Sequence, residues 1–214
     1  GIGVWYSDDP TVDCSYQPAP GQIPASIERI DLDFCDSDPN YVYAITTNSG
    51  FLGGVFRSTD GGLNWSVNTP LPPTNTIDST FSLFGTNGQG FYDLAIEVFP
   101  NDCEKLMIGG VQIYKIDGSW IRVAETFASP FSGIYVHADQ HYFTFDPKNP
   151  NTLYIGNDGG VGVSYNATSG NMTFSTLNRN FTTTQFYDIA VGPQGLVLGG
   201  TQDNGTFLLE TSDT

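Results

Sequence analysis

Apolar and polar residues alternate along several short stretches of the chain, which is the pattern of β-strands with one buried face. One such stretch, Ile30–Phe34, is followed by a Pro/Asn turn and by a second apolar stretch at Tyr41–Tyr43. Val, Ile, Thr and aromatic residues dominate these stretches, and many of the 25 Gly and 13 Pro separate them. We find no convincing amphipathic helix, so the pattern predicts an all-β fold.

The same two-strand unit recurs along the chain. Its copies begin near residues 30, 94, 142 and 189, a period of roughly 50 residues that suits a four-stranded propeller blade. We therefore predict a β-propeller of four-stranded antiparallel blades. The expected boundaries are 1–20 for the end of one blade, 27–70, 90–125 and 137–178 for three blades, and 184–214 for the start of the next. Because a blade buries its two apolar faces only against neighbouring blades, we expect a partial ring of about four blades. Further blades from the same or another chain would complete it.

The sharpest local motif is Ser58-Thr59-Asp60-Gly61-Gly62 followed by Trp65. The Asp60 carboxylate can accept backbone N–H groups in an Asx-type turn, and the glycines permit positive φ. Weaker copies stand at Ser7/Asp9, Asp117/Trp120 and Ser164/Asn166. We predict that the clean copy fastens the outer edge of a blade through Ser58, Asp60, Gly62 and Trp65.

Charge narrows the classes of partner. The chain has 23 acidic and 7 basic residues and a formal net charge of −16. So few cations cannot form a phosphate-binding stripe, which excludes nucleic acid and an anionic membrane surface as expected partners. No apolar run reaches the roughly 18 residues of a spanning helix, so we expect no membrane insertion. An acidic, lysine-poor composition favours an extracellular or cell-surface location.

Three cysteines, Cys14, Cys35 and Cys103, cannot all pair within one chain. Cys35 and Cys103 fall in the same strand-to-strand loop of adjacent repeats. In an exported protein they would form a disulfide between neighbouring blades and leave Cys14 unpaired. Three buried thiols are the alternative.

The motif around Asp60 resembles the Asp-box, or BNR repeat, of sialidases, sortilin-type receptors and xyloglucanase-like glycoside hydrolases. Other stretches resemble the propeller region of large exported bacterial proteins that end in a C-terminal sorting domain. These stretches are Gly88–Ile96, His137–His141, Gly156–Gly160, Thr184–Tyr187 and Gly199–Thr206. The resemblance implies the fold but no single function, because Asp-boxes are structural turns in enzymes and binding proteins alike.

A xyloglucanase-like hydrolase needs two carboxylates that face each other about 5 to 10 Å apart. Asp93 and Asp139 are the best pair, because each stands shortly before the innermost strand of neighbouring blades. Both aspartates could instead pin loops at the blade entrance. Aromatic residues that could stack on sugar rings are Phe91, Tyr92, Phe186 and Tyr187. A sialidase would need three clustered arginines, whereas the four arginines of this chain are scattered.

The stretch His137-Ala138-Asp139-Gln140-His141 contains both histidines of the protein. On a strand, His137, Asp139 and His141 point to one side and could hold Zn²⁺ or another divalent cation. A straight strand separates residues i and i+4 by about 13 Å, so this site requires a bulge or turn. The alternative for His141 is a hydrogen-bonded interior position.

Two acidic loops, Asn157–Gly160 and Gln202–Gly205, could bind Ca²⁺ through carboxylate and backbone oxygens. They lack regular calcium-loop spacing, so tight turns that close the second strand of a blade onto the third are the favoured interpretation.

The sequence thus favours a non-catalytic, exported β-propeller module that binds or assembles with glycans or proteins. The alternative is a glycoside hydrolase with Asp93 and Asp139 as acid and base.

Overall fold

The protein is described from a computed structural model. The structure describes residues 4–7, 17–18, 21, 23–24, 26–70, 72, 83–180, 183–192, 195–202 and 205–209. Within these ranges the chain forms antiparallel sheets and contains no α-helix. Consequently, no helix of the described part is long and apolar enough to cross a membrane.

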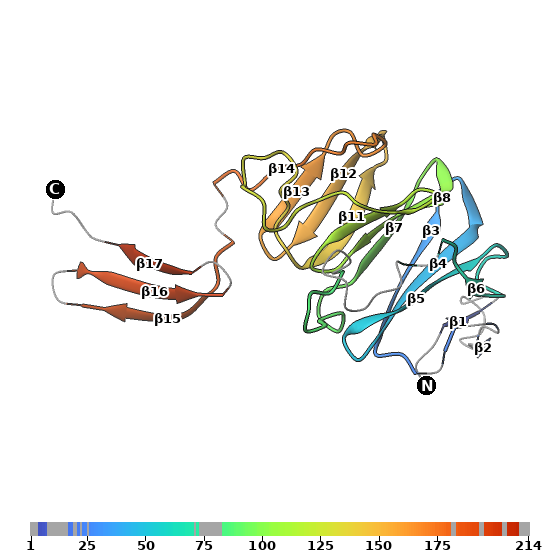
Figure 1. Cartoon of the computed structure of the whole chain (residues 1–214), viewed down its shortest axis with the longest axis horizontal. Coiled ribbons are helices and arrows are strands. Elements are labelled where there is room, and N and C mark those ends of the chain that lie inside the picture. Colours follow the sequence, from blue (N-terminus) through green and yellow to red (C-terminus); the bar gives the residue numbers. More distant parts are fainter. Residues whose placement is uncertain are drawn as a thin grey trace. The chain divides into compact units, whose positions relative to one another are not determined.

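The chain divides into two compact units, Gly1–Leu177 and Asn178–Thr214. The first unit contains three sheets of four strands each (Figure 1). The first sheet consists of β3 (Arg29–Cys35), β4 (Asp38–Asn48), β5 (Phe51–Ser58) and β6 (Ser66–Val67). The second consists of β7 (Ala95–Phe99), β8 (Asp102–Gly109), β9 (Ile113–Ile116) and β10 (Trp120–Arg122). The third consists of β11 (Gln140–Asp146), β12 (Asn149–Asn157), β13 (Gly160–Ser164) and β14 (Ser175–Thr176).

Each of these sheets is a meander in which every strand pairs with the next one along the chain. A short antiparallel pair, β1 (Trp5–Tyr6) with β2 (Gln17–Pro18), precedes them. The second unit is a three-stranded meander of β15 (Phe186–Val191), β16 (Val197–Thr201) and β17 (Thr206–Leu209). The all-β prediction with four-stranded antiparallel blades is confirmed, and we refer to the three four-stranded sheets as the first, second and third blades.

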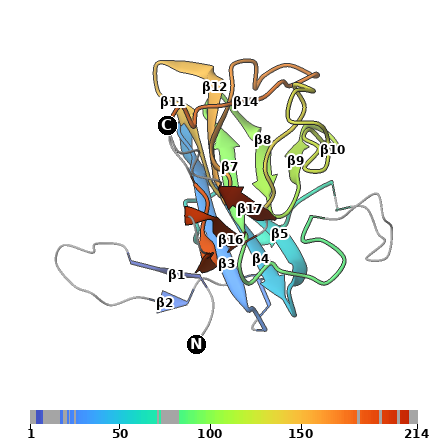
Figure 2. The same cartoon turned by 90° about the vertical axis from the view of Figure 1, so that its left-hand side faces the viewer.

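The blades of the first unit pack face to face. Their first strands lie side by side, with β7 between β3 and β11 (Figures 1 and 2). Because side chains alternate across a strand, the second blade contributes to two cores. Leu106 and Ile108 of β8 pack toward the first blade, whereas Met107 packs toward the third. All three side chains are fully buried.

Carboxylates connect the first strands of neighbouring blades, which share no sheet. Asp31 Oδ2 accepts a hydrogen bond from the Ile96 N–H at 3.3 Å, and Asp33 Oδ2 accepts one from the Val98 N–H at 2.6 Å. One blade further on, Glu97 Oε1 accepts one from the N–H of Phe145 at 3.1 Å. We call Asp31, Asp33 and Glu97 the latch carboxylates.

The turn after β5 is held by its own side chains. Ser58 Oγ accepts the N–H of Gly62 at 2.9 Å, and Asp60 Oδ1 accepts the N–H of Asn64 at 2.8 Å. The Trp65 indole N–H donates to the Gly62 carbonyl at 2.8 Å. These contacts give the turn the structural role expected for it, while its assignment to the BNR repeat family stays a prediction.

A related turn follows β13 of the third blade. There Ser164 Oγ lies 3.1 Å from Asn166 Oδ1, and Oδ1 also accepts the N–H of Thr173 at 2.9 Å. Asn166 thus takes the place that Asp60 has in the first blade. In the proposed N-terminal copy, Asp9 lies outside the described residues.

A disulfide joins Cys35, at the end of β3, to Cys103 in β8, with 5.3 Å between the two Cα atoms. It links the first blade to the second at the β3–β4 and β7–β8 turns. Cys14 lies outside the described residues.

Candidate functional site

The candidate site lies where the chain enters the second and third blades, just before β7 and β11. The loop before β7 is tied to the first blade by a hydrogen bond of 2.8 Å from the Gly90 N–H to the Gly50 carbonyl. The guanidinium of Arg29, in β3, donates to the backbone carbonyls of Phe91, Tyr92 and Leu94. The first blade therefore fixes the loop that carries Asp93.

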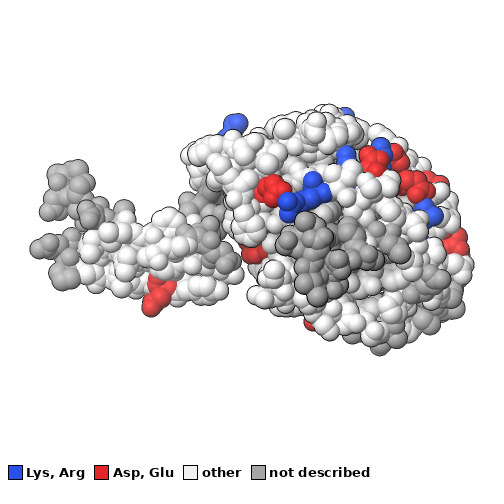
Figure 3. Space-filling model, viewed as in Figure 1, with Lys and Arg blue, Asp and Glu red and all other residues white. Residues whose placement is uncertain are grey.

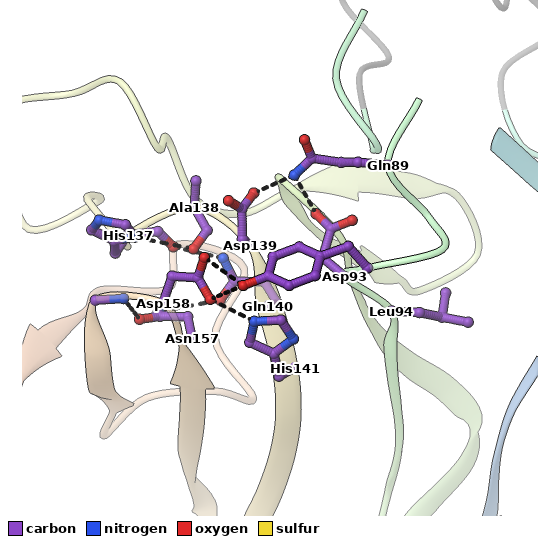
Figure 4. A network of polar contacts seen from close by, with 12 residues as sticks. Gln89, Asp93, Leu94, His137, Ala138, Asp139, Gln140, His141, Asn157 and Asp158 are labelled. Atoms are coloured by element: carbon purple, nitrogen blue, oxygen red, sulfur yellow. Dashed lines mark hydrogen bonds and ion pairs between the residues drawn. The ribbon is translucent and has the colours of Figure 1, made fainter. Parts of the chain in front are cut away.

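Asp93 and Asp139, which are 46 residues apart in the sequence, meet through one side chain. The Gln89 amide nitrogen donates to Asp93 Oδ2 at 3.2 Å and to Asp139 Oδ1 at 2.6 Å (Figure 4). The two carboxylate oxygens are therefore roughly 6 Å apart at most, since each lies within hydrogen-bond distance of the same nitrogen. The structure thus brings together the two carboxylates that the sequence paired.

Asp93 has no solvent-exposed surface in the structure, at 0 % relative exposure. Its Oδ1 has no hydrogen-bond partner within the described part of the chain. Burial raises the pKa of Asp93 to about 7; the Gln89 hydrogen bond opposes this shift and the nearby Asp139 carboxylate adds to it. Close to neutral pH, Asp93 therefore exists in both protonated and ionised forms.

Asp139 sits in a turn rather than on a straight strand. Its φ of 65° lies in the left-handed region, which Asp adopts more readily than most residues. The Gln140 amide donates to the carbonyl of His137 at 2.6 Å and closes this turn. The turn directs the Asp139 carboxylate toward Gln89 and Asp93.

The expected convergence of His137, Asp139 and His141 on a metal is absent from the structure (Figure 4). His137 lies against Gly159, and its Nδ1 is 3.1 Å from the Ala138 carbonyl. His141 Nε2 lies 2.6 Å from Asp158 Oδ1. Because of the turn at Asp139, the three side chains point to different neighbours. Among the residues described, no group of three or more His, Cys, Asp or Glu side chains could hold a metal ion.

Asp158 organises a second set of contacts beside the carboxylate pair. The Tyr92 hydroxyl lies 3.0 Å from both Asp158 carboxylate oxygens. The rings of Tyr92 and His141 meet edge to face with centroids 5.0 Å apart. Tyr92, His141 and Asp158 therefore connect the entrances of the second and third blades.

Sequence reasoning missed the roles of Gln89 and Asp158. Asp158 belongs to one of the two acidic loops, and the structure makes that loop the tight turn between β12 and β13, where the Gly159 N–H donates to Asn157 Oδ1 at 3.0 Å. Asp203 and Asn204 of the other loop lie outside the described residues. The position of Gln89, four residues before Asp93 in the same short loop, was the available signal for its role.

Exposed aromatic residues belong to the loop before β7 and to β11, which form this entrance. Phe91 is 60 % exposed, Tyr92 43 % and Tyr142 66 %. The other two predicted sugar-stacking residues, Phe186 and Tyr187, are exposed on β15 of the second unit.

Three of the four arginines have partners elsewhere. Arg57 pairs with Glu104 at 2.7 Å and Arg122 with Glu125 at 2.6 Å, while Arg29 holds backbone carbonyls. They therefore form no common carboxylate-binding cluster of the kind that a sialidase requires.

Comparisons with known proteins give structural similarities only. No family model matches the chain, and no curated protein matches it. An ancestral GH74 enzyme aligns with 15 % identity and a TM-score of 0.48 over 91 % of this chain and 27 % of its own length. The GH74 xyloglucanase of Xanthomonas campestris gives 17 % identity and a TM-score of 0.49 over 83 % of this chain and 27 % of its own. The GH74 enzyme of Niastella koreensis gives 12 % identity and a TM-score of 0.40 over 84 % of this chain and 35 % of its own length. The chain thus spans between about a quarter and about a third of the length of these structures.

Proposed function

We propose that this chain is part of an exported, non-catalytic β-propeller that binds a glycan at the entrance of its second and third blades. The observation that carries this proposal is the complete burial of Asp93 beside exposed aromatic side chains. A hydrolytic carboxylate must reach the glycosidic oxygen or the attacking water. A buried aspartate joined to its partner by a glutamine amide is better suited to holding two loops in place.

The exposed aromatic residues provide the chemistry for binding. Phe91 and Tyr92 precede Asp93 on a loop fixed by Arg29, and Tyr142 follows the turn at Asp139 on β11. Rigid aromatic faces pack against the apolar faces of sugar rings with little loss of side-chain entropy. Phe186 and Tyr187 stay candidates for contacts of the same kind. The alternative ligand of the same surface is a protein partner.

Export is supported by the disulfide between Cys35 and Cys103. Disulfides of this structural kind persist mainly in oxidising compartments. The net charge of −16 keeps such a protein soluble outside the cell.

A glycoside hydrolase is the second candidate, and one observation favours it. The pKa of Asp93 is raised to about 7, which suits a general acid, and Asp139 lies close enough to act with it. An oxygen separation of roughly 6 Å at most is compatible with a retaining enzyme and is shorter than the values usual for inverting enzymes. This function would require the Asp93 loop to open.

Incubating the purified chain with a panel of β-glucans separates the two candidates. Retention on the polysaccharide and release of reducing ends are measured together for the wild type, Phe91→Ala and Asp93→Asn. We expect the wild-type chain to be retained on the polysaccharide without releasing reducing ends. Phe91→Ala should weaken this retention about fivefold or more, because aromatic stacking is lost. Phe127→Ala is the matched control, because Phe127 is 86 % exposed on the loop before β11. Release that disappears in Asp93→Asn would establish the hydrolase instead.

A further inference from the structure

A cavity of about 200 Å³ lies at the opposite end of β7 from Asp93, between the second and third blades. Pro100 and Asn101 of the β7–β8 turn line it, together with Pro150 of the β11–β12 turn and Thr168 of the loop after β13. The six residue-to-residue steps from Asp93 to Phe99 span about 20 Å of extended chain. The cavity is therefore separate from the proposed glycan-binding entrance.

Three charged residues line this cavity, Asp102, Lys105 and Lys115, and Lys115 of β9 is the most buried, with a side chain that is only 2 % exposed. Strand alternation puts Ile113 and Lys115 on the face toward the third blade, whereas Tyr114 and Ile116 face the first. Burial of an ammonium group is costly unless its donors are satisfied.

The Lys115 ammonium group has more N–H donors than it has acceptors within hydrogen-bond distance. It donates one hydrogen bond, at 3.0 Å, to the Ser169 carbonyl. Its carboxylate neighbour, Asp117 Oδ2, is 3.8 Å away, which is beyond hydrogen-bond distance. An ammonium group has three N–H donors. Within the described part of the chain, two of them therefore lack a hydrogen-bond acceptor.

A second lysine lines the same cavity. Lys105 Nζ lies 3.2 Å from Asp102 Oδ2 and 3.5 Å from Asp117 Oδ2. Two of the seven basic residues of this acidic chain thus meet at one small cavity. On the face shown in Figure 3, basic side chains are few, and several of them lie next to acidic ones. The two lysines and the two aspartates, Asp102 and Asp117, cancel in net charge, so the attraction for an anion comes from the N–H donors of Lys115 that lack an acceptor.

The volume and the lining residues of the cavity indicate what else the ligand must contain besides a negative charge. A volume of about 200 Å³ is below the range of drug-sized ligands and suits a single ring. Phe99, Pro100 and Pro150 offer apolar contact for a ring face, and Asn101 and Thr168 are polar. We propose that this cavity binds an acidic sugar residue, with its carboxylate on Lys115 and its ring against the two prolines.

Calorimetric titration with methyl β-D-glucuronide, and with neutral methyl β-D-glucoside as the paired probe, tests this assignment. We expect saturable binding of the glucuronide and at least tenfold weaker binding of the glucoside, because only the former provides a charge-assisted hydrogen bond to Lys115. Lys115→Met keeps an apolar side chain of similar length and should weaken glucuronide binding at least tenfold. Lys148→Met is the matched control on the exposed β11–β12 turn and should leave affinity unchanged.

Lys105→Met provides a second test if Lys115→Met does not fold, as judged by circular dichroism. This variant leaves Lys115 in place and should weaken glucuronide binding several-fold. Equal affinity for glucuronide and glucoside, or no binding of either, would overturn the proposal. Acetate binding as tightly as the glucuronide would show that the ring makes no contribution, which would overturn the sugar assignment.

Discussion

At the scale of single residues, one amide determines the geometry of the candidate site. Gln89 separates two carboxylates that would otherwise repel each other directly, and its nitrogen bonds to both. An amide is neutral, so it satisfies an oxygen of each carboxylate without cancelling either charge. This explains why the pKa of Asp93 stays raised although the side chain has a hydrogen-bond donor.

Replacing this amide should destabilise the protein. Gln89→Leu removes a donor from two carboxylates, one of them fully buried, so we expect the free energy of unfolding to fall by about 1 to 3 kcal/mol. Urea unfolding followed by tryptophan fluorescence measures this change. Asn87→Leu, at an exposed position of the same loop, should change it by less than about 0.5 kcal/mol. Equal effects of the two substitutions would show that the Gln89 bridge contributes nothing specific.

The sequence could predict the partners in this site but not their connection. The repeat alignment predicts the pair Asp93 and Asp139, because each precedes the innermost strand of adjacent repeats. The bridge by Gln89 depends on how a loop fixed to Gly50 and Arg29 folds back, which strand periodicity does not encode. The metal prediction for His137 and His141 was based on an extended strand, and the left-handed turn at Asp139 invalidates that assumption.

At the scale of elements, the latch carboxylates connect strands that belong to different sheets. Asp31 and Asp33 reach from β3 to β7, and Glu97 reaches from β7 to β11. Burial raises the pKa of Glu97 to about 8, and the nearby carboxylate of Asp33 adds to the shift. Burial also raises the pKa of Asp33 to about 6. These contacts therefore place several acidic groups where ionisation is unfavourable.

This arrangement predicts that stability decreases as the pH rises. The pKa of Glu97 is higher in the folded protein than its ordinary value of 4.5, so the folded state binds more protons between these values. The free energy of unfolding therefore falls as the pH increases from about 4.5 to about 8. Glu97→Gln keeps an oxygen acceptor for the Phe145 N–H but cannot ionise, so its stability should depend less on pH. Melting temperatures measured from pH 5 to pH 8 test this expectation.

Glu104→Gln is the control for that series, because Glu104 is an exposed glutamate on β8 and its surface ion pair with Arg57 contributes little to stability. It should retain the pH dependence of the wild type. If Glu97→Gln retains that dependence as well, ionisation of Glu97 does not limit the stability of the fold.

Strand alternation predicted the blades well because their two cores need apolar residues at every second position. It could not predict the latches. In an alternating strand such as Ile30–Phe34, aspartates at the polar positions suggest exposure to solvent. In the structure the neighbouring blade half-buries these aspartates, and its backbone N–H groups donate hydrogen bonds to their carboxylates.

At the scale of the whole molecule, several sheet faces remain uncovered. Leu32 and Phe34 of β3 are exposed although they stand in a strand of the first blade. The sheet of the second unit also exposes large apolar side chains, namely Ile189, Val191, Leu198, Phe207 and Leu208. Apolar faces of this kind normally pack against neighbouring blades, so we propose that further blades from the same or another chain cover them.

The isolated 214-residue chain should therefore associate. We expect light scattering to give a mass above the 23.2 kDa of one chain, increasing with concentration, because association buries the uncovered faces. Phe34→Ser should reduce this tendency, whereas Phe127→Ser, at an exposed position of the loop before β11, is a matched control outside the sheets. A folded, monodisperse species of one chain mass at every concentration would contradict the proposal of missing blades.

The disulfide between Cys35 and Cys103 also has a mechanical consequence. A pulling force applied to the two ends of the chain would pass through the sulfur–sulfur bond and bypass the segment between them. The 68-residue separation corresponds to about 230 Å of fully extended chain that force could not release while the bond is intact. The β4–β6 strands lie within this segment and would unravel under load only after reduction. If the protein is displayed on a cell surface, as proposed, the bond would limit how far a pulling force could extend the chain, and the redox state of the surroundings would set that limit.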